Sequence, residues 1–264
     1  MKEEYTIHNY PKSRIGTFDV GAMSSMRHHV FGIMEVDVTD ARKKIAKLKK
    51  GGRPVSFTSW LLKCIGDVVN KHPVIHGVKK GKRKIIAFNS VDISIMIEKM
   101  VGSVPVPIPY IVREANGKSI ADIYKEIRAA RDQRIEDEGD YVLGESRGRL
   151  LMYLYYLLPG FMRRLSWKII LSNPKLVKNL MGSVIVTSVG MVANVRGWII
   201  PRSIHPLCFA IGSINPRPGV VNGEICVREY LPITVLIDHD VIDGSPAVRV
   251  INELVRALEG GYLL

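Results

Sequence analysis

The residues best suited to chemistry lie in one short cluster near the C-terminus, Asp238-His239-Asp240-Val241-Ile242-Asp243-Gly244. Alternating apolar residues ahead of the cluster predict a strand that ends at His239, Gly244 permits a sharp turn, and Ser245-Pro246 predicts a helix start. An imidazole titrates near neutral pH and can act as a general base when a neighbour fixes its orientation, and Asp243 follows four residues on. His239 is therefore a candidate general base, although a strand-end histidine among aspartates is also a common structural arrangement.

The other reactive side chains form no recognisable site. No HExxH spacing, GxSxG elbow, P-loop or GxGxxG is present, which removes support for metal, hydrolase, kinase and dinucleotide-binding functions. Three scattered cysteines without a CxxC exclude a disulfide scaffold and a cysteine zinc site, and they indicate a reducing, cytoplasmic compartment. They are Cys64, Cys208 and Cys226, and the histidines outside the cluster include His28, His29, His72, His76 and His205.

Length and charge set wider limits. The chain has 264 residues, is 47% hydrophobic and carries 38 Lys+Arg against 25 Asp+Glu, a net charge of +13. These values predict a packed core and a partner that is nucleic acid, an anionic membrane or a phosphorylated small molecule. The lysine clusters at 43–50 and 79–84 lack interleaved aromatic residues, so we expect no nucleic-acid binding.

The elements around the cluster follow from hydrophobic periodicity and capping residues. We expect helices after Thr39-Asp40, after Ser56 and after Ser119, and an extended edge segment at the alternating prolines 105, 107 and 109. Residues 85–88 and 91–97 have the composition of a hairpin, and 136–149 that of a loop. Strands are predicted at 30–38, 183–187, 207–211, 224–228 and 232–238, with a turn at Asn222-Gly223, and Ser245 caps the last helix. The mixture favours an α+β domain with a largely antiparallel mixed sheet covered by helices.

One apolar stretch, residues 150–171, is interrupted by Pro159-Gly160 and Arg163-Arg164. This pattern predicts two short helices. The tyrosines and the cations that follow them would also suit a membrane surface. We expect instead that the two helices pack in the core or at a subunit interface, and we therefore expect no membrane partner.

The cluster also carries a family resemblance. HDVIDG at 239–244 matches the H-x-x-x-D-G motif of the chloramphenicol acetyltransferase-like superfamily. EVDVTDARK at 35–43, VSFTSWLLKCIGDVVNKHP at 55–73 and AIGSINPRPGVVNGEICVREYLPITVLIDHDVIDG at 210–244 resemble the catalytic domain of 2-oxoacid dehydrogenase acyltransferases, the E2 components. The resemblance covers 28–134 and 182–258. It implies a single domain over 1–264 with a two-layer chloramphenicol acetyltransferase-like fold, an N-terminal extension at 1–27 and a divergent insertion at 135–181.

In this family the motif histidine, here His239, takes the thiol proton of coenzyme A or a dihydrolipoyl group. A hydroxyl side chain donates to the tetrahedral oxyanion, and the matching position is Thr187, with Ser188 in reserve. The motif aspartate, Asp243, is structural and pairs with an arginine near the N-terminus, which nominates Arg27 and places Gly244 in the supporting loop.

The resemblance further implies CoA or acyl-CoA as substrate, no metal, and a homotrimer whose active sites lie between subunits. The sequence departs from the family pattern in two ways. Most E2 enzymes have arginine where this chain has Asp240, which adds negative charge around His239. We also expect no lipoyl domain in this chain, so either a lipoyl domain acts in trans or another small-molecule acyl acceptor is used. The alternative function is an E2-like trimer that has lost catalysis and acts as a scaffold or binding module.

Overall fold

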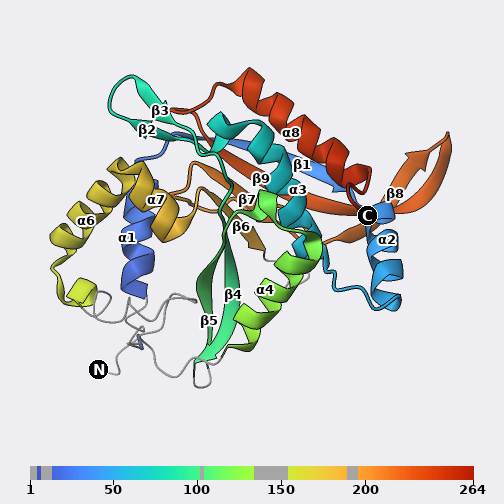
Figure 1. Ribbon diagram of the computed structural model, residues 1–264, viewed down its shortest axis with the longest axis horizontal. Coiled ribbons are helices and arrows are strands. Elements are labelled where there is room, and N and C mark those ends of the chain that lie inside the picture. The colour runs from blue at the N-terminus through green and yellow to red at the C-terminus, as the bar shows by residue number, and fades with distance from the viewer. Residues whose placement is uncertain (1–4, 7–13, 102–103, 134–153, 189–195) are drawn as a thin grey trace.

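The computed structural model describes residues 5–6, 14–101, 104–133, 154–188 and 196–264. Within them one mixed sheet of seven strands forms the centre of the molecule (Figure 1). Its order is β1 (His29–Asp37), β9 (Glu224–Asp238), β7 (Leu207–Ile211), β6 (Val184–Ser188), β4 (Ile93–Val101) and β5 (Val104–Val112), and β8 (Asn215–Val221) also pairs with β9. Only the β4–β6 and β6–β7 pairs are parallel in this part of the chain.

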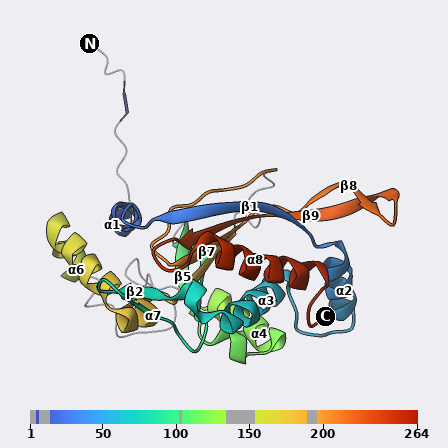
Figure 2. The same ribbon diagram turned by 90° about the horizontal axis from the view of Figure 1, so that it is seen from above.

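Four helices cover one face of this sheet (Figure 2): α2 (Thr39–Lys50), α3 (Phe57–Lys71), α4 (Ile120–Asp132) and α8 (Gly244–Glu259). Helix α3 packs against both α4 and α8. Its start is fixed by a cap, and its apolar residues recur at helical spacing, which gives it a buried face. Ser56 caps the helix, as predicted, and the Ser59 side chain in return accepts from the Ser56 backbone N–H. The fully buried Trp60 donates its indole N–H to the Tyr262 carbonyl at 2.8 Å, which ties the C-terminus to the core.

The opposite face of the sheet carries a segment of irregular chain instead of helices. Residues 196–206 cross it, and the Trp198 indole donates to the Met34 carbonyl of β1 at 2.8 Å. Cys208, Ala210, Thr234 and Leu236 are buried and stand outside the cluster that packs against the helices. The sheet is therefore covered on both sides near β7 and β9, while Phe31 and Ile33 of β1 remain exposed.

A second unit of three helices lies at one end of the sheet. It contains α1 (Arg14–Ser24), α6 (Gly160–Ser172) and α7 (Pro174–Met181), with the β2 (Val78–Lys80) and β3 (Lys84–Ile86) hairpin beside it (Figure 1). The buried Asp19 of α1 accepts from the Tyr155 hydroxyl at 2.6 Å and from Arg163 Nε at 2.7 Å, and the Trp167 indole donates to Tyr155. The two short helices expected within 150–171 are thus α6 and the helical turn 154–157 ahead of it.

Several element predictions were wrong at their boundaries. The expected hairpin of 85–88 with 91–97 does not form, because β3 pairs with β2 across the lysine-rich turn and β4 pairs with β5. The strands predicted at 224–228 and 232–238 are one continuous strand, β9, since Pro232 lies opposite Glu35 without breaking it. β8 was not predicted, because Pro216 and Pro218 argue against a strand interior; it pairs only with β9 among the described strands.

Two helix starts also differ from the prediction. Helix α8 begins at Gly244 with Asp243 at its N-cap, rather than at Ser245. Helix α2 begins at Thr39, whose hydroxyl binds the Asp37 carboxylate at 2.6 Å instead of capping the helix. The proline-rich edge strand and the Ser119 capping box are confirmed as β5 and the start of α4. The loop predicted at 136–149 lies outside the described residues.

Candidate active site

His239 lies on the turn that links β9 to α8. Strand β9 ends at Asp238, opposite His29 of β1, and the His239 backbone N–H donates to the His28 carbonyl at 2.9 Å. The Val241 N–H donates back to the Asp238 carbonyl at 3.0 Å, which closes the turn. The His239 side chain is exposed and has no hydrogen-bond partner among the described residues. The turn is fixed through its backbone, and the imidazole is open to a substrate.

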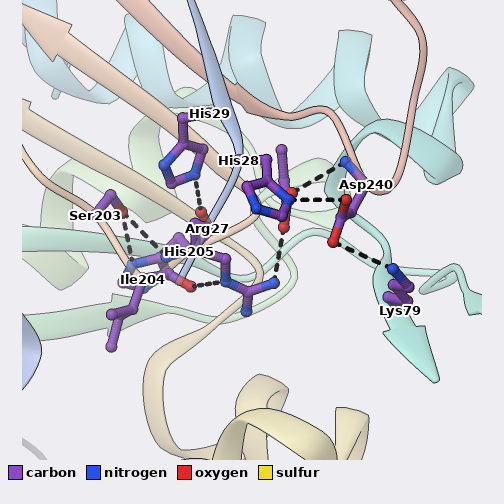
Figure 3. A network of polar contacts seen from close by, with 9 residues as sticks. Arg27, His28, His29, Lys79, Ser203, Ile204, His205 and Asp240 are labelled. Carbon is purple, nitrogen blue, oxygen red and sulfur yellow. Dashed lines mark hydrogen bonds and ion pairs between the residues drawn. The ribbon is translucent and has the colours of Figure 1, made fainter. Parts of the chain in front are cut away.

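Arg27 holds this turn in place, but through a different aspartate from the one expected. Its Nη1 donates to Asp238 Oδ2 at 2.8 Å and its Nε donates to the Ile204 carbonyl at 3.1 Å (Figure 3). The two side chains are only 12% and 2% exposed, so this is a buried ion pair. The predicted Arg27–Asp243 pair is absent from the described chain. Arg27 instead contacts the residue directly before His239, because β1 and β9 are antiparallel neighbours.

Asp243 and Gly244 play smaller parts than predicted. Asp243 is exposed at the N-cap of α8, and its side chain makes no capping bond; a carboxylate there favours the helix through the helix dipole. Gly244 has no positive φ, and a Cβ built on it would meet nothing within 4 Å. Within one chain, neither residue is required for the shape of the turn.

Asp240, the residue that departs from the family pattern, forms two ion pairs. Its carboxylate contacts His28 Nδ1 at 3.1 Å and Lys79 Nζ at 3.2 Å, which joins the turn to β1 and to the β2–β3 hairpin (Figure 3). The His28 hydrogen bond, followed by Lys79, lowers the pKa of Asp240. The negative charges at Asp238 and Asp240 therefore each have a cationic partner, which reduces their electrostatic effect on His239.

Two histidines beneath the turn are neutral structural groups. His205 is buried and its Nε2 lies 2.8 Å from the Met181 carbonyl, while burial lowers its pKa to about 4. His29 Nε2 lies 2.9 Å from the His205 carbonyl, and burial also lowers its pKa (Figure 3). These imidazoles support the backbone around Arg27 without adding positive charge at neutral pH.

Thr187 and Ser188 lie at the end of β6 on opposite faces of the sheet. Thr187 is in register with Ala210 of β7, which is in turn in register with Thr234 of β9, and registered neighbours share a face. Side chains two residues apart along β9 also share a face, so Thr187 is on the same face as Asp238. Ser188 instead lines a cavity under the helices. The register therefore places Thr187 on the face that carries Asp238, and Ser188 on the face under the helices.

The cavity beside Ser188 has a volume of about 520 Å³. It opens between α2, α3 and the ends of β6 and β7, and its lining includes Arg42, Lys49, Phe57, Ser188 and Ser213. Two cations and the three hydroxyls of Thr58, Ser188 and Ser213 stand among apolar side chains, and this lining suits a ligand with both an anionic and an apolar part.

The structure does not bring His239 and Thr187 together within one chain. Thr187 lies level with Thr234 of β9, through Ala210 of β7 between them. Thr234 is five residues before His239, so Thr187 and His239 are separated by about 16 Å along the strand direction. The groups that sequence reasoning missed are Asp238 as the partner of Arg27, and His28 and Lys79 as the partners of Asp240. The Arg27–Asp238 contact is revealed only by the pairing of β1 with β9, since Arg27 and Asp238 are 211 positions apart in the sequence. No group of three metal-ligating side chains occurs in the described residues.

The comparisons with known proteins bear on the family and the fold of the chain. The model of the 2-oxoacid dehydrogenases acyltransferase catalytic domain matches residues 22–138 and 181–264. A curated relative is the dihydrolipoyllysine-residue acetyltransferase component of the pyruvate dehydrogenase complex of Mycoplasma pneumoniae. It is 24% identical over 217 residues, which are 80% of this chain and 43% of the relative. The chain therefore spans less than half the length of that curated relative.

Two solved structures are similar over nearly their whole length. One is a probable dihydrolipoamide acetyltransferase from Listeria monocytogenes, with 18% identity, a TM-score of 0.66 and coverage of 98% of this chain and 96% of the other. The second is the cubic core of a pyruvate dehydrogenase multienzyme complex, with 17% identity, a TM-score of 0.66 and coverage of 98% and 93%. These likenesses show the fold, which confirms the α+β, chloramphenicol acetyltransferase-like prediction. By the match of its family model over most of its length, the chain belongs to the 2-oxoacid dehydrogenase acyltransferase family.

Proposed function

We propose that the chain is a CoA-dependent acyltransferase in which His239 is the general base. The observation that carries the proposal is the exposed imidazole on a turn fixed by the buried Arg27–Asp238 pair. A general base needs an accessible nitrogen on a rigid support, and both conditions are met at this position. Membership of the acyltransferase family supplies the reaction class.

In the proposed reaction His239 removes the proton from a substrate thiol. The thiolate attacks the carbonyl carbon of an acyl thioester, and the carbonyl oxygen becomes a tetrahedral oxyanion to which the Thr187 hydroxyl donates. Collapse of this intermediate breaks the old carbon–sulfur bond, and the departing thiolate takes the proton back from the His239 imidazolium. CoA is one thiol partner, and the other is a dihydrolipoyl group or another small acceptor.

We further propose that each active site is completed by a neighbouring subunit of a homotrimer. The separation of about 16 Å along the strands between His239 and Thr187 supports this proposal, because it is too long for the two side chains to meet in one chain. The similar solved structure is the cubic core of a pyruvate dehydrogenase multienzyme complex. A lipoyl domain acting in trans would fit this arrangement, as would a free acceptor that enters between subunits.

The cavity beside Ser188 is the place we propose for part of the acyl-CoA. Lys49 has no carboxylate partner among the described residues, and Arg42 contacts Glu229 at 3.3 Å, so at least one cation is available for a phosphate. The cavity adjoins the end of β6 that carries Thr187. Lys49→Gln should therefore raise the KM for acetyl-CoA and leave kcat nearly unchanged.

The test is a thiol-release assay with acetyl-CoA and small thiol or amine acceptors. We expect turnover by the wild-type chain and a loss of about 10²–10⁴-fold in kcat for His239→Ala, with unchanged circular dichroism. His72→Ala is the matched control, because it removes a partly exposed histidine that contacts Glu253 and takes no part in the His239 turn. Equal turnover by wild type and His239→Ala would refute the base, and absence of both turnover and CoA binding would favour the scaffold function.

A further inference from the structure

The outward face of α6 is apolar although it belongs to a helix at the surface. Phe161, Leu165 and Ile169 follow one another at four-residue spacing, so they share one side of the helix, and we call them the α6 stripe. Their side chains are 65%, 56% and 56% exposed. The other side of the helix, with Trp167 and Leu171, packs on the α1 and α7 unit. The stripe therefore stays largely exposed in the part of the chain that the structure describes.

Three cations around the α6 stripe have no acidic partner among the residues that the structure describes. Arg164 and Lys168 lie three residues after Phe161 and Leu165, which places them along the border of the stripe, and Lys175 follows at the start of α7. All three are exposed, and none forms an ion pair with any described residue. The sequence contains no Asp or Glu from 146 to 223.

We propose that the α6 stripe docks this protein on the surface of an anionic lipid bilayer. An apolar stripe bordered by Arg and Lys is the arrangement of helices that lie in the plane of a membrane, with the apolar side chains below the headgroups and the cations beside the lipid phosphates. The Asp19 contacts with Tyr155 and Arg163 fix α6 to the body of the protein, so docking would anchor the whole domain. This inference does not depend on the acyltransferase activity.

A second copy of the chain fits this surface less well. A symmetric contact between two α6 stripes would bring Arg164 and Lys168 of both copies together without any carboxylate from this region to neutralise them. No helix in the described residues is long and apolar enough to cross a bilayer. The proposal revises the expectation, drawn from the sequence, that a membrane is not a partner.

Co-sedimentation with lipid vesicles tests the proposal. The full chain is mixed with vesicles of phosphatidylcholine alone or with about one third phosphatidylglycerol, and we expect binding only to the anionic vesicles. The pair Arg164→Gln and Lys168→Gln should weaken binding on the order of 30-fold, since each cation near an anionic surface contributes about fivefold. The pair Phe161→Ser and Leu165→Ser should weaken it at least about tenfold.

Two matched control pairs make the result specific. Lys47→Gln with Lys50→Gln removes two exposed cations from α2, and Ile225→Ser with Val227→Ser removes two apolar side chains that are 79% and 74% exposed on β9. Both should bind anionic vesicles like wild type. Absence of wild-type binding, or equal loss in the α2 control, would overturn the proposal. So would a change of oligomeric mass, measured by light scattering, when Phe161 and Leu165 are replaced, because it would assign the α6 stripe to contacts between copies.

Discussion

Replacing Arg27 by Ala should be among the most damaging single changes near the candidate site. It would leave the Asp238 carboxylate, which is 2% exposed, without its cation, and the Ile204 carbonyl without one of its donors. Removing one partner of a buried ion pair destabilises a protein by about 3–5 kcal/mol. Arg27 Nη2 is itself buried without a partner among the described residues, so we expect the lower part of that range.

Guanidinium unfolding at fixed protein concentration measures this change, because subunit association also contributes to stability. The control is Arg128→Ala, which removes an exposed Arg–carboxylate pair at 3.8 Å and should alter stability by less than about 0.5 kcal/mol. The double variant Arg27→Met with Asp238→Leu removes both charges and should be more stable than Arg27→Ala. A loss below about 1 kcal/mol for Arg27→Ala would refute the claim that this pair holds the His239 turn.

Three further outcomes follow from the structure. Gly244→Ala should leave unfolding free energy and acyl transfer within about 0.5 kcal/mol of wild type, and a larger effect would show that the glycine contacts another subunit or substrate. Gly182→Ala should destabilise by at least about 2 kcal/mol in a denaturant titration, because its φ is +72° and the added Cβ would lie 2.8 Å from the Asp92 carbonyl oxygen. Folded His205 has a pKa of about 4 against 6.5 when unfolded, so the unfolded state binds more protons between these values. Stability should therefore fall as the pH drops from about 6.5 to 4, by about 3 kcal/mol for this group, and a His205→Gln variant should show a shallower fall.

Local sequence signals predicted most of the helices and the short buried strands. The Ser56 and Ser119 capping boxes, the alternating prolines of β5 and the apolar run of β7 each determine structure through neighbouring residues. The lysine-rich turn was placed correctly, but its strand partner was not, because pairing depends on residues far apart in the chain. The prolines of β8 argue against a strand, but β8 forms one because an edge strand does not use every backbone N–H for pairing.

The candidate site shows the same contrast between local signals and contacts between residues far apart in the chain. His239 could be found from its motif and from the strand that precedes it. Its supports could not, because Arg27 meets Asp238 only through the antiparallel pairing of the first and last strands of the chain. The faces of Thr187 and Ser188 also depend on the register of three strands. The domain limits, the cytoplasmic location and the identity of the acyl acceptor stay predictions.

Mixed trimers test the central claim most directly. A chain with His239→Ala and a chain with Thr187→Val are inactive alone, so they are co-expressed in equal amounts and purified together. If each site combines His239 of one subunit with Thr187 of the next, random assembly restores about a quarter of the wild-type sites. Thiol release from acetyl-CoA near that fraction is the predicted result. Activity no higher than that of either variant alone would contradict an active site shared between subunits.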